Sequence, residues 1–399
     1  MLRFVPPAGV PLKMAQILRA LKMVLSSNGQ TEECLASFAA RLQVRYVFGV
    51  SSGRAALWLI LKSLQRLRPN RCVVALPAYT CFSVPASVVR AGLKLHPLEI
   101  DPETLDFDFS QLDSVPHEKL LCIVTSNLFG LVNDLPRIRQ IAQAKEAFLV
   151  DDAAQSLGAS WNHHCSGTLA DVGFYSLGRG KSLAAIEGGL VVTNSEEIAR
   201  AIQAEAGNLS APSFAHDAWL VLQMLAYATF LTPRLYWIPN SLPFLKLGIT
   251  EFAPNFLTTH LPDLCRALLP QLMDGLPEIN QVRWKNATAI ADALAGNPHF
   301  TVPRPASNCR PSYIRFPLIA RDEAIRQRAT IRLRSKGIGA SSFYPTAICD
   351  IAGIESHMAL SDFHRPQAEA LSQRLLTLPT HPYVRQEDLN RMIDILNRL

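Results

Sequence analysis

The sequence predicts an α/β protein with a large domain and a smaller C-terminal α/β domain, the large one built on a mostly parallel mixed sheet flanked by helices. From about residue 50 to 195, short β-rich runs alternate with helical stretches, which is typical of parallel strands joined by helices. A second alternation begins near residue 280. We therefore expect an N-terminal segment over residues 1–30, a large domain over 31–275 and a small domain over 276–399.

The large domain is expected to contain helices at 54–67 and 83–91, and strands at 73–76, 121–125 and 148–150. A further helix should begin after Asp134, which can cap it, with Pro136 in its first turn. The strand at 148–150 ends at Asp151 and Asp152. Ligands in open α/β sheets lie beyond the carboxyl ends of the strands, so these carboxylates are candidates for a binding site.

Residues 207–250 interrupt this alternation with an apolar insertion. Residues 218–232 and 235–247 are two apolar runs, and the first is shorter than the roughly 20 residues that cross a bilayer. A helix buried in the core or at a dimer interface is the interpretation we favour. The alternative is that residues 218–247 make a peripheral contact with a membrane surface.

The small domain is expected to contain a strand at 312–318 and three helices, at 323–336, 367–375 and 386–399. Gly337 follows the first of these helices, as a residue that ends a helix often does. The three helices and the strand together predict a second, smaller α/β unit.

Composition narrows the class of protein. Apolar residues make up 49% of the chain and charged residues 18%, so it is expected to be globular. The net charge is +6 without a run of five basic residues, so nucleic acid is not an expected partner. Eight scattered cysteines and an N-terminus without a signal-peptide core favour a cytoplasmic protein. No metal site is expected, because adjacent residues such as His163, His164 and Cys165 seldom converge on one ion.

The most informative residue is Lys181. It follows the carboxylates Asp151 and Asp152 and the hydroxyl of Ser176, and it precedes the sequence EGG at 187–189. A lysine amine can hold pyridoxal phosphate as a Schiff base, and a carboxylate can keep the ring nitrogen protonated. A small hydroxyl can bind the phosphate. This order of residue types predicts a pyridoxal phosphate site.

The sequence GRGKS at 178–182 suggests a competing interpretation, a nucleotide-binding P-loop. That motif requires a glycine at the position of Tyr175, and no strand followed by a glycine-rich loop leads into it. The P-loop interpretation is therefore disfavoured.

Several blocks resemble the DegT/StrS family of sugar-nucleotide aminotransferases over nearly the whole length. The sequence SSGRAAL at 51–57 is similar to that family's first phosphate-binding turn, and PAYT at 77–80 to its second block. DDAAQ at 151–155 matches the family's acidic block, and LLTLPTHP at 375–382 its C-terminal signature. The resemblance implies the aspartate-aminotransferase-like fold, type I of the pyridoxal phosphate enzymes.

The resemblance also implies roles for individual residues. Lys181 would be the catalytic lysine that binds the coenzyme and moves protons, and Asp152 would pair with the pyridine nitrogen. Gln155 would lie near the ring hydroxyl. The phosphate would be held by Ser176 and by the backbone amides of Gly53 and Arg54, at a helix N-terminus that favours an anion.

The sequence departs from the family pattern at one position beside the coenzyme and at two on the substrate side. Cys81 stands where the family has an aromatic residue that stacks on the ring, so Tyr79 or Phe82 would stack instead. Asn127 replaces a frequent histidine, and the block that begins at Tyr344 is altered, so both are candidate substrate contacts. Asn255 is the candidate for the asparagine that the family supplies from the partner subunit of a homodimer.

The resemblance therefore implies a homodimeric aminotransferase that moves nitrogen from an amino acid, L-glutamate, to a keto sugar linked to a nucleotide. Its products would feed polysaccharide or glycoconjugate biosynthesis. Two alternatives stay open. One is a sibling enzyme that removes a sugar hydroxyl, a branch in which histidine replaces the lysine. The other is a regulatory or binding protein that has kept the fold without turnover.

Overall fold

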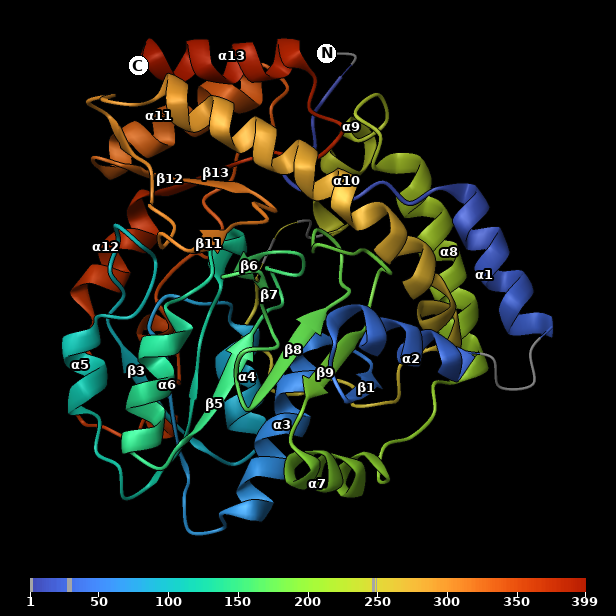
Figure 1. Ribbon diagram of the computed structural model, residues 1–399. Coiled ribbons are helices and arrows are strands. Elements are labelled where there is room, and N and C mark those ends of the chain that lie inside the picture. Colours follow the sequence, from blue (N-terminus) through green and yellow to red (C-terminus); the bar gives the residue numbers. More distant parts are fainter. Residues whose placement is uncertain (1–2, 27–30, 246–247, 249) are drawn as a thin grey trace.

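The computed structural model describes residues 3–26, 31–245, 248 and 250–399. Within them, a seven-stranded sheet of order β1-β9-β8-β5-β4-β2-β3 occupies the centre of the large domain (Figure 1). Pairs from β8 to β3 are parallel, and β9 runs antiparallel to both β8 and β1, which confirms the predicted mostly parallel mixed sheet. The strands are β1 (Tyr46–Val50), β2 (Val73–Pro77), β3 (Lys94–Leu98), β4 (Leu120–Val124), β5 (Phe148–Asp152), β8 (Val172–Ser176) and β9 (Gly189–Thr193).

Helices cover both faces of this sheet because alternate strand residues point to opposite sides. Val191 of β9 belongs to the hydrophobic core under α3, whereas its neighbours Leu190 and Val192 belong to the core that includes α2. The helices on the first face are α3 (Gly53–Leu67), α4 (Ser83–Arg90) and α7 (Glu196–Ala206), and those on the second are α2 (Thr31–Leu42), α5 (Phe109–Ser114) and α6 (Leu135–Ala144).

The predicted elements of the large domain are confirmed with small changes of boundary. Helices α3, α4 and α6 correspond to the predicted helices, and the carboxylate of Asp134 caps α6 by accepting a hydrogen bond from the Arg137 amide at 3.2 Å. Strands β2, β4 and β5 correspond to the predicted strands. Residues 160–165 form a hairpin of β6 (Ser160–Trp161) and β7 (His164–Cys165), which pairs with β11 (Cys309–Arg310).

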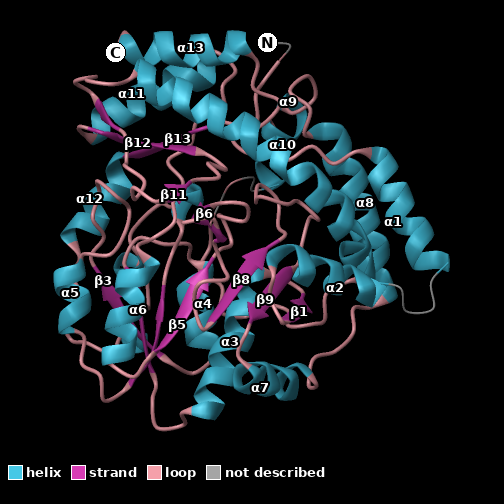
Figure 2. Cartoon of the chain, in the orientation of Figure 1, coloured by secondary structure: helices cyan, strands magenta, loops and turns pink. Residues whose placement is uncertain are grey.

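The C-terminal part contains a smaller antiparallel sheet of order β10-β12-β13, packed against helices (Figure 2). A 31-residue helix, α10 (Asp263–Ala293), leads into it and runs without a break through residue 275, so the domain boundary there stays a prediction. The remaining elements are β10 (Phe300–Thr301), β12 (Phe316–Ala320), β13 (Leu375–Leu378), α11 (Glu323–Ser335), α12 (Pro366–Arg374), α13 (Gln386–Asn397) and the short helices η3 (Ile348–Asp350) and η4 (Glu355–His357).

The strand predicted at 312–318 is wrong in its first half. Residues 312–315 do not join β12, because their amides bond to a turn of the large domain that contains the short helix η1 (Leu128–Gly130). The Ser312 amide donates to the Gly130 carbonyl at 3.2 Å, and the Ile314 amide donates to the Phe129 carbonyl at 3.1 Å. These bonds attach the small sheet to the large domain beside the carboxyl end of β5.

The apolar insertion forms helix α8 (Phe214–Phe230), helix α9 (Trp237–Asn240) and the short helix η2 (Pro243–Leu245). Helix α8 packs against α1 (Met14–Ser26) at the edge of the molecule (Figure 1). Residues 246, 247 and 249 of the predicted apolar region lie outside the described residues. Within the described ranges, no helix is long and apolar enough to cross a bilayer.

Residues 3–10 form an extended N-terminal strap that is held by the C-terminal part of the chain. The Val5 amide donates to the Gly337 carbonyl at 2.8 Å, and the Gly339 amide donates to the Val5 carbonyl at 2.9 Å. Arg3 forms an ion pair with Asp388 of α13 at 2.5 Å. The strap therefore joins the two ends of the sequence.

Candidate active site

The carboxyl end of β5 places two acidic side chains on opposite faces of the sheet. Asp152 pairs with Phe174 of β8 on the α3 side, and Asp151 pairs with Gly173 on the α6 side. Both side chains are buried. Their hydrogen-bond partners differ, so one carboxylate has a structural role and the other is free to bind a ligand.

Asp151 is held by three donors from the chain. The Thr125 hydroxyl donates to it at 3.0 Å, the Asn127 side-chain amide at 2.6 Å and the Gly167 backbone amide at 2.6 Å. Burial raises the pKa of Asp151, and these hydrogen bonds oppose that rise. A carboxylate so fully bonded is a structural anchor.

Asn127, a predicted substrate contact, is part of the same buried network. Its side-chain oxygen accepts from the Asn133 amide at 3.0 Å, while its NH₂ group bonds to Asp151. Its side chain is 1% exposed. The structure therefore places Asn127 behind the carboxylates, and its contact with substrate stays a prediction.

Asp152 has fewer partners and lies near a cation. The Ala154 amide donates to its carboxylate at 2.9 Å. Burial raises its pKa to about 6, while the Ala154 hydrogen bond and the charge of Lys181 act in the opposite direction. The influence of Lys181 means that its ammonium lies within electrostatic reach of Asp152. At neutral pH this carboxyl group is mostly ionised, and it can receive a cationic partner.

Lys181 is half-buried on the loop that joins β8 to β9. Its amide donates to the Gly178 carbonyl at 3.2 Å, and further along the loop Ile186 has a φ of +74°. A β-branched residue rarely adopts this backbone conformation, and such strain concentrates at functional sites. The loop is thus held in one shape by its surroundings.

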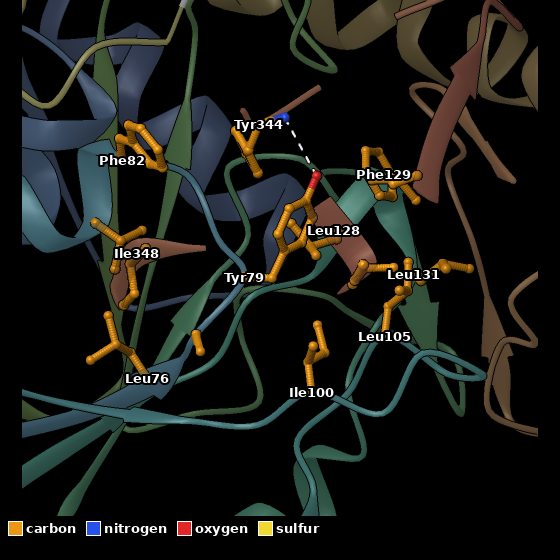
Figure 3. Close-up of a cluster of buried hydrophobic side chains, with 14 of the residues drawn as sticks. Leu76, Tyr79, Phe82, Ile100, Leu105, Leu128, Phe129, Leu131, Tyr344 and Ile348 are labelled. Atoms are coloured by element: carbon orange, nitrogen blue, oxygen red, sulfur yellow. Dashed lines mark hydrogen bonds between the residues drawn. The ribbon is translucent and has the colours of Figure 1, made fainter. Parts of the chain in front are cut away.

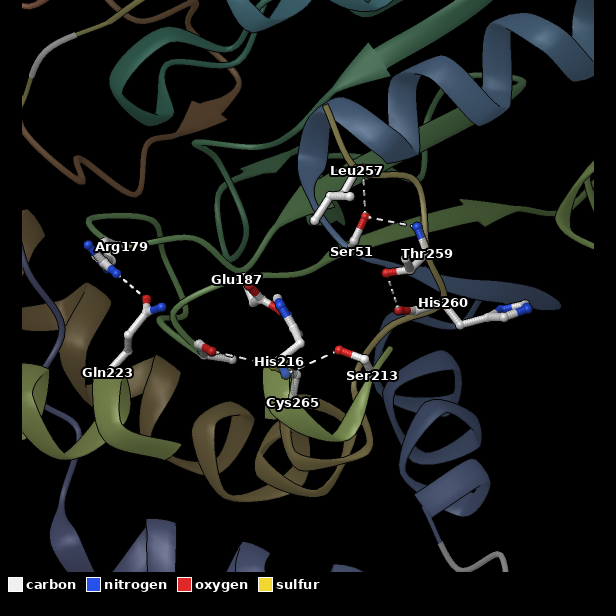
Figure 4. Close-up of polar contacts among 11 residues, drawn as sticks. Ser51, Arg179, Glu187, Ser213, His216, Gln223, Leu257, Thr259, His260 and Cys265 are labelled. Atoms are coloured by element: carbon white, nitrogen blue, oxygen red, sulfur yellow. Dashed lines mark hydrogen bonds and ion pairs between the residues drawn. The ribbon is translucent and has the colours of Figure 1, made fainter. Parts of the chain in front are cut away.

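Helix α8 supplies part of that support. His216 Nε2 lies 2.6 Å from Glu187 Oε1, and Arg179 donates to the side chain of Gln223 (Figure 4). Glu187 and Arg179 flank the Lys181 loop segment, while His216 and Gln223 belong to α8. The apolar insertion is therefore bonded directly to the loop that carries the lysine.

Ser176 and Gly53 meet as the sequence predicts. A Cβ placed on Gly53 would lie 3.0 Å from Ser176 Cβ and 3.2 Å from its Oγ, so only glycine fits easily there. Gly53 begins α3, whose N-cap Ser52 accepts from the Ala55 amide at 3.1 Å. The N-terminus of a helix attracts anions, so Ser176 and the amides of Gly53 and Arg54 form a suitable phosphate cradle.

Gln155 and the aromatic residues form a second buried network above the sheet. The Gln155 side-chain amide donates to the Tyr344 hydroxyl at 2.9 Å. The Tyr344 backbone amide donates to the Tyr79 hydroxyl at 3.4 Å (Figure 3). The rings of Tyr79 and Tyr344 lie 5.5 Å apart. Tyr344, predicted as a substrate contact, thus connects the small domain with Gln155 and Tyr79.

Cys81 and Phe82 follow Tyr79 on the turn before α4. The Ser83 hydroxyl lies 2.9 Å from the sulfur of Cys81, which is partly buried, whereas Phe82 and Tyr79 are buried. All three lie close to the Tyr344 cluster or to the core under α3. Which of them stacks on a coenzyme ring stays a prediction.

Asn255 lies on an exposed loop that is fixed to the predicted phosphate cradle. The neighbouring ring of Phe256 packs under the guanidinium groups of Arg54 at 5.4 Å and Arg90 at 4.4 Å. Asn255 itself is exposed. This position is compatible with the predicted reach into a partner subunit, which stays a prediction.

Sequence reasoning missed Arg315. Its guanidinium donates to the Ser341 hydroxyl at 3.0 Å, lies 5.0 Å from the Phe343 ring, and lies 4.0 Å from a Cβ built on Gly180. Burial lowers its pKa to about 10, so it stays protonated. Among the described residues it has no ion pair with an acidic side chain. No local motif signals this, because the site of Arg315 is assembled from distant segments.

The described residues fit pyridoxal phosphate. They offer an amine, an ionisable buried carboxylate near that amine, and a hydroxyl beside a helix N-terminus that begins with a closely packed glycine. Amine, carboxylate and anion cradle are the three groups that this coenzyme requires. Fold and site together define a pyridoxal phosphate enzyme of fold type I.

The chain belongs to the DegT/DnrJ/EryC1/StrS aminotransferase family, whose model matches residues 12–397. This confirms the family resemblance, the fold and the coenzyme, pyridoxal phosphate. The match extends over both the large domain and the C-terminal part, so the site and the small sheet belong to one family architecture.

The individual relatives share low sequence identity with this chain, and their names describe different functions. A pleiotropic regulatory protein of Geobacillus stearothermophilus is 23% identical, with 95% of this chain and 91% of that protein covered. A UDP-N-acetyl-3-dehydro-alpha-D-glucosamine 3-aminotransferase of Acidithiobacillus ferrooxidans is 24% identical, covering 96% and 92%. An E. coli GDP-4-keto-6-deoxy-D-mannose-3-dehydratase solved with hydrated pyridoxal phosphate has a TM-score of 0.79 at 20% identity, covering 99% and 100%.

Proposed function

We propose that this protein transfers the amino group of an amino acid, L-glutamate, to the keto group of a nucleotide-linked sugar. The observation that carries the proposal is that the buried carboxylate of Asp152, at the carboxyl end of β5, lies within electrostatic reach of Lys181 and on the same sheet as the Ser176 and Gly53 cradle. The family assignment supports amino transfer as the reaction class. The product would be an amino sugar for polysaccharide or glycoconjugate biosynthesis.

Three groups of the chain would hold the coenzyme. Ser176 and the first-turn amides of α3 would bind its phosphate, Asp152 would pair with its protonated ring nitrogen, and Lys181 would hold its aldehyde carbon. When bound, pyridoxal phosphate supplies a ring that accepts electrons from the α-carbon of the amino acid. Asp152 maintains that capacity because an ionised carboxylate stabilises the proton on the ring nitrogen.

Lys181 would move the proton in both half-reactions. Its amine, once displaced by the amino donor, removes the proton from the donor α-carbon. In the second half-reaction the same amine delivers a proton to the sugar carbon that receives nitrogen. Ile186 and the contacts of α8 keep the loop in position for this transfer.

Arg315 is our candidate for binding the carboxylate of the amino donor. It is a protonated guanidinium without an acidic partner in the described part of the chain, and it lies next to the loop residue that precedes Lys181. Burying a cation is costly unless an anion pairs with it, so a ligand carboxylate would stabilise this side chain.

Two relatives point to other functions, and the active-site lysine bears on both. The dehydratase relative supports loss of a sugar hydroxyl as an alternative, and the regulatory relative supports a role without turnover. Lys181 favours amino transfer over the dehydratase branch, in which histidine takes the place of the lysine. A chain that binds the coenzyme but never releases 2-oxoglutarate would support the regulatory alternative.

The test is a two-stage assay on the coenzyme-loaded protein. In the first stage, L-glutamate should bleach the coenzyme absorption and release 2-oxoglutarate. In the second, keto sugars linked to different nucleotides are supplied and the aminated product is identified by mass spectrometry. Lys181→Ala is the control, since it should bind coenzyme without turnover. Glutamate that leaves the wild-type spectrum unchanged would contradict the proposal.

We further propose that the protein works in the cytoplasm as a homodimer in which Asn255 of one subunit completes the site of the other. Support comes from the exposed position of Asn255 on a loop that is anchored by Arg54 beside the phosphate cradle.

A further inference from the structure

Exposed apolar side chains are concentrated on one edge of the molecule. Of sixteen large hydrophobic residues exposed among the described residues, twelve lie within 14–25 and 214–245. A soluble monomer rarely exposes so many large apolar side chains on neighbouring elements unless they form an interaction site. The twelve residues are Met14, Leu18, Leu25, Phe214, Trp219, Leu222, Phe230, Leu235, Trp237, Leu242, Phe244 and Leu245.

Helix α8 is apolar on its outer side as well as its inner side. Leu220 and Met224 are buried against the body, whereas Trp219 and Leu222 are more than half exposed, at 57% and 53%. An ordinary surface helix carries charged or polar residues on its outer side. After Asp217 in its first turn, α8 contains no charged residue.

Helix α1 continues this surface and adds positive charge. It packs against α8, and its exposed residues Leu18 and Leu25 are accompanied by Arg19 and Lys22. Residues 1–31 contain four basic and no acidic residues, and residues 218–250 contain two basic and none acidic. None of Lys13, Arg19, Lys22 and Arg234 forms an ion pair within the described ranges.

We propose that the surface formed by α1, α8 and α9 docks on an anionic lipid bilayer. The apolar side chains would enter the boundary between headgroups and acyl chains, and the basic residues would contact anionic headgroups. Trp219 and Trp237 suit this interfacial depth, because their rings are both apolar and polar. The surface lies on the membrane and does not cross it, since no described helix is long and apolar enough.

A second copy of the chain fits this surface less well. A two-fold contact would place the same patch on both subunits, and residues 1–31 and 218–250 contain no acidic residue that could pair with the basic residues of α1. Like charges across an interface are destabilising, whereas an anionic bilayer neutralises them. Charge complementarity therefore favours lipid as the occupant.

The experiment is flotation of the coenzyme-loaded protein with vesicles of phosphatidylcholine, with and without phosphatidylglycerol. We expect wild-type protein to float with the anionic vesicles, less with neutral ones, and less at high salt. Trp219→Glu with Leu222→Glu should lower the bound-to-free ratio about ten-fold or more, because two anchors become anionic. Arg19→Glu with Lys22→Glu should remove the preference for anionic lipid.

Matched controls come from α11, which is not part of the proposed lipid-binding surface. Ile331 on α11 is an exposed apolar residue, at 68%, and Arg328 is an exposed basic residue on the same helix. Ile331→Glu and Arg328→Glu should float as wild type does. If the α8 variant proves unfolded by circular dichroism, Trp237→Glu with Phe244→Glu tests the same surface.

Three results would overturn the proposal. The first is that wild-type protein does not float with the vesicles. The second is that the α8 variant floats as well as the wild type. The third is that light scattering gives the α8 variant half the molecular mass of the wild type. The last result would identify the surface as a contact between copies. None of these measurements depends on turnover, so they stand apart from the proposed amino transfer.

Discussion

Asp151 and Asp152 are adjacent in sequence, but they have different partners. Asp151 accepts three hydrogen bonds from the chain, whereas Asp152 accepts one and lies near Lys181. Alternation along β5 produces this difference, because it sends one side chain to each face of the sheet. Two substitutions of the same type should therefore have different consequences.

Asp152→Asn should retain coenzyme but lower kcat about 100-fold or more, a loss typical of removing one charge-stabilising group from an active site. Asp151→Asn should lower the free energy of unfolding by about 1–3 kcal/mol, because an amide cannot accept from all three donors. Steady-state kinetics and thermal unfolding separate the two effects. Equal losses of kcat per folded molecule would show that the roles are wrongly assigned.

The pKa of Asp152 predicts how coenzyme binding depends on pH. Burial raises this pKa to about 6, so below pH 6 the carboxyl group is neutral in the coenzyme-free protein. Binding to a protonated ring nitrogen requires the ionised form, so affinity should rise with pH up to about 6 and then level off. The coenzyme phosphate titrates in the same range, so Asp152→Asn is the control. Identical pH profiles for the two proteins would contradict the pairing.

Arg315→Met should raise the KM for the amino donor about 10- to 100-fold, the expected cost of losing a hydrogen bond between charged groups. Arg315→Lys retains the charge and should recover part of the loss. The coenzyme spectrum and the KM for the sugar should not change. A rise in the sugar KM alone would assign Arg315 to the acceptor.

Residues of the site could be predicted where their signals are local. Asp152, Ser176 and Lys181 follow one another within 30 residues, and the chemistry of the coenzyme requires their types in combination. Arg315 could not be predicted. What marks it as a site residue is that it is partly buried without an acidic partner among the residues that the structure describes, and only the folded structure shows this. The sequence likewise did not predict that Asn127 lies in the hydrogen-bond network of Asp151.

The local sequence predicts where helices and strands form, but contacts with distant residues determine the residues at which they begin and end. Helix α6 begins after its capping Asp134, as predicted. The strand predicted from residue 312 begins instead at Phe316, because residues 312–315 bond to the turn at 129–130. Helix α8 was predicted from its apolar run. Helices α1 and α7 are not among the predicted elements, although both are amphipathic.

Gly130→Ala tests the junction between that turn and residues 312–315. Gly130 has a φ of +91°, and a Cβ there would lie 2.2 Å from Ser312 Oγ and 2.8 Å from the Tyr313 amide nitrogen. Backbone strain and overpacking together should lower the free energy of unfolding by about 2–5 kcal/mol. Denaturant unfolding measures the loss.

Gly92→Ala is the matched control for Gly130→Ala. Gly92 has a φ of +77° with nothing within 4 Å of the added Cβ, so it carries the strain without the contact. Its expected cost is about 1–2 kcal/mol. Equal costs at both glycines would show that the junction adjusts to the extra atom.

At the scale of the whole molecule, the proposed homodimer predicts that two inactive variants can restore each other. Lys181→Ala and Asn255→Ala should each be inactive alone. If Asn255 acts across the interface, co-expression produces mixed dimers with one intact site, and about a quarter of wild-type activity returns. Activity of the purified mixture is the measurement.

The control pair for this complementation is Lys181→Ala with Asp152→Asn. Both residues belong to the same subunit's site, so no mixed dimer of these two variants contains an intact site. Activity should stay absent. Restored activity in the control, or none in the Asn255 mixture, would contradict the shared-site arrangement.

The N-terminal strap has a consequence for how the chain acquires its structure during synthesis. Arg3 binds Asp388 across 385 residues of sequence, and Val5 pairs with Ile338. The strap is therefore synthesised more than 300 residues before the segments that cover it. Contacts between such distant residues form slowly, since a long loop must close first. Until α13 is synthesised, we expect the strap to stay accessible to chaperones and proteases, and its docking to be a late step of folding.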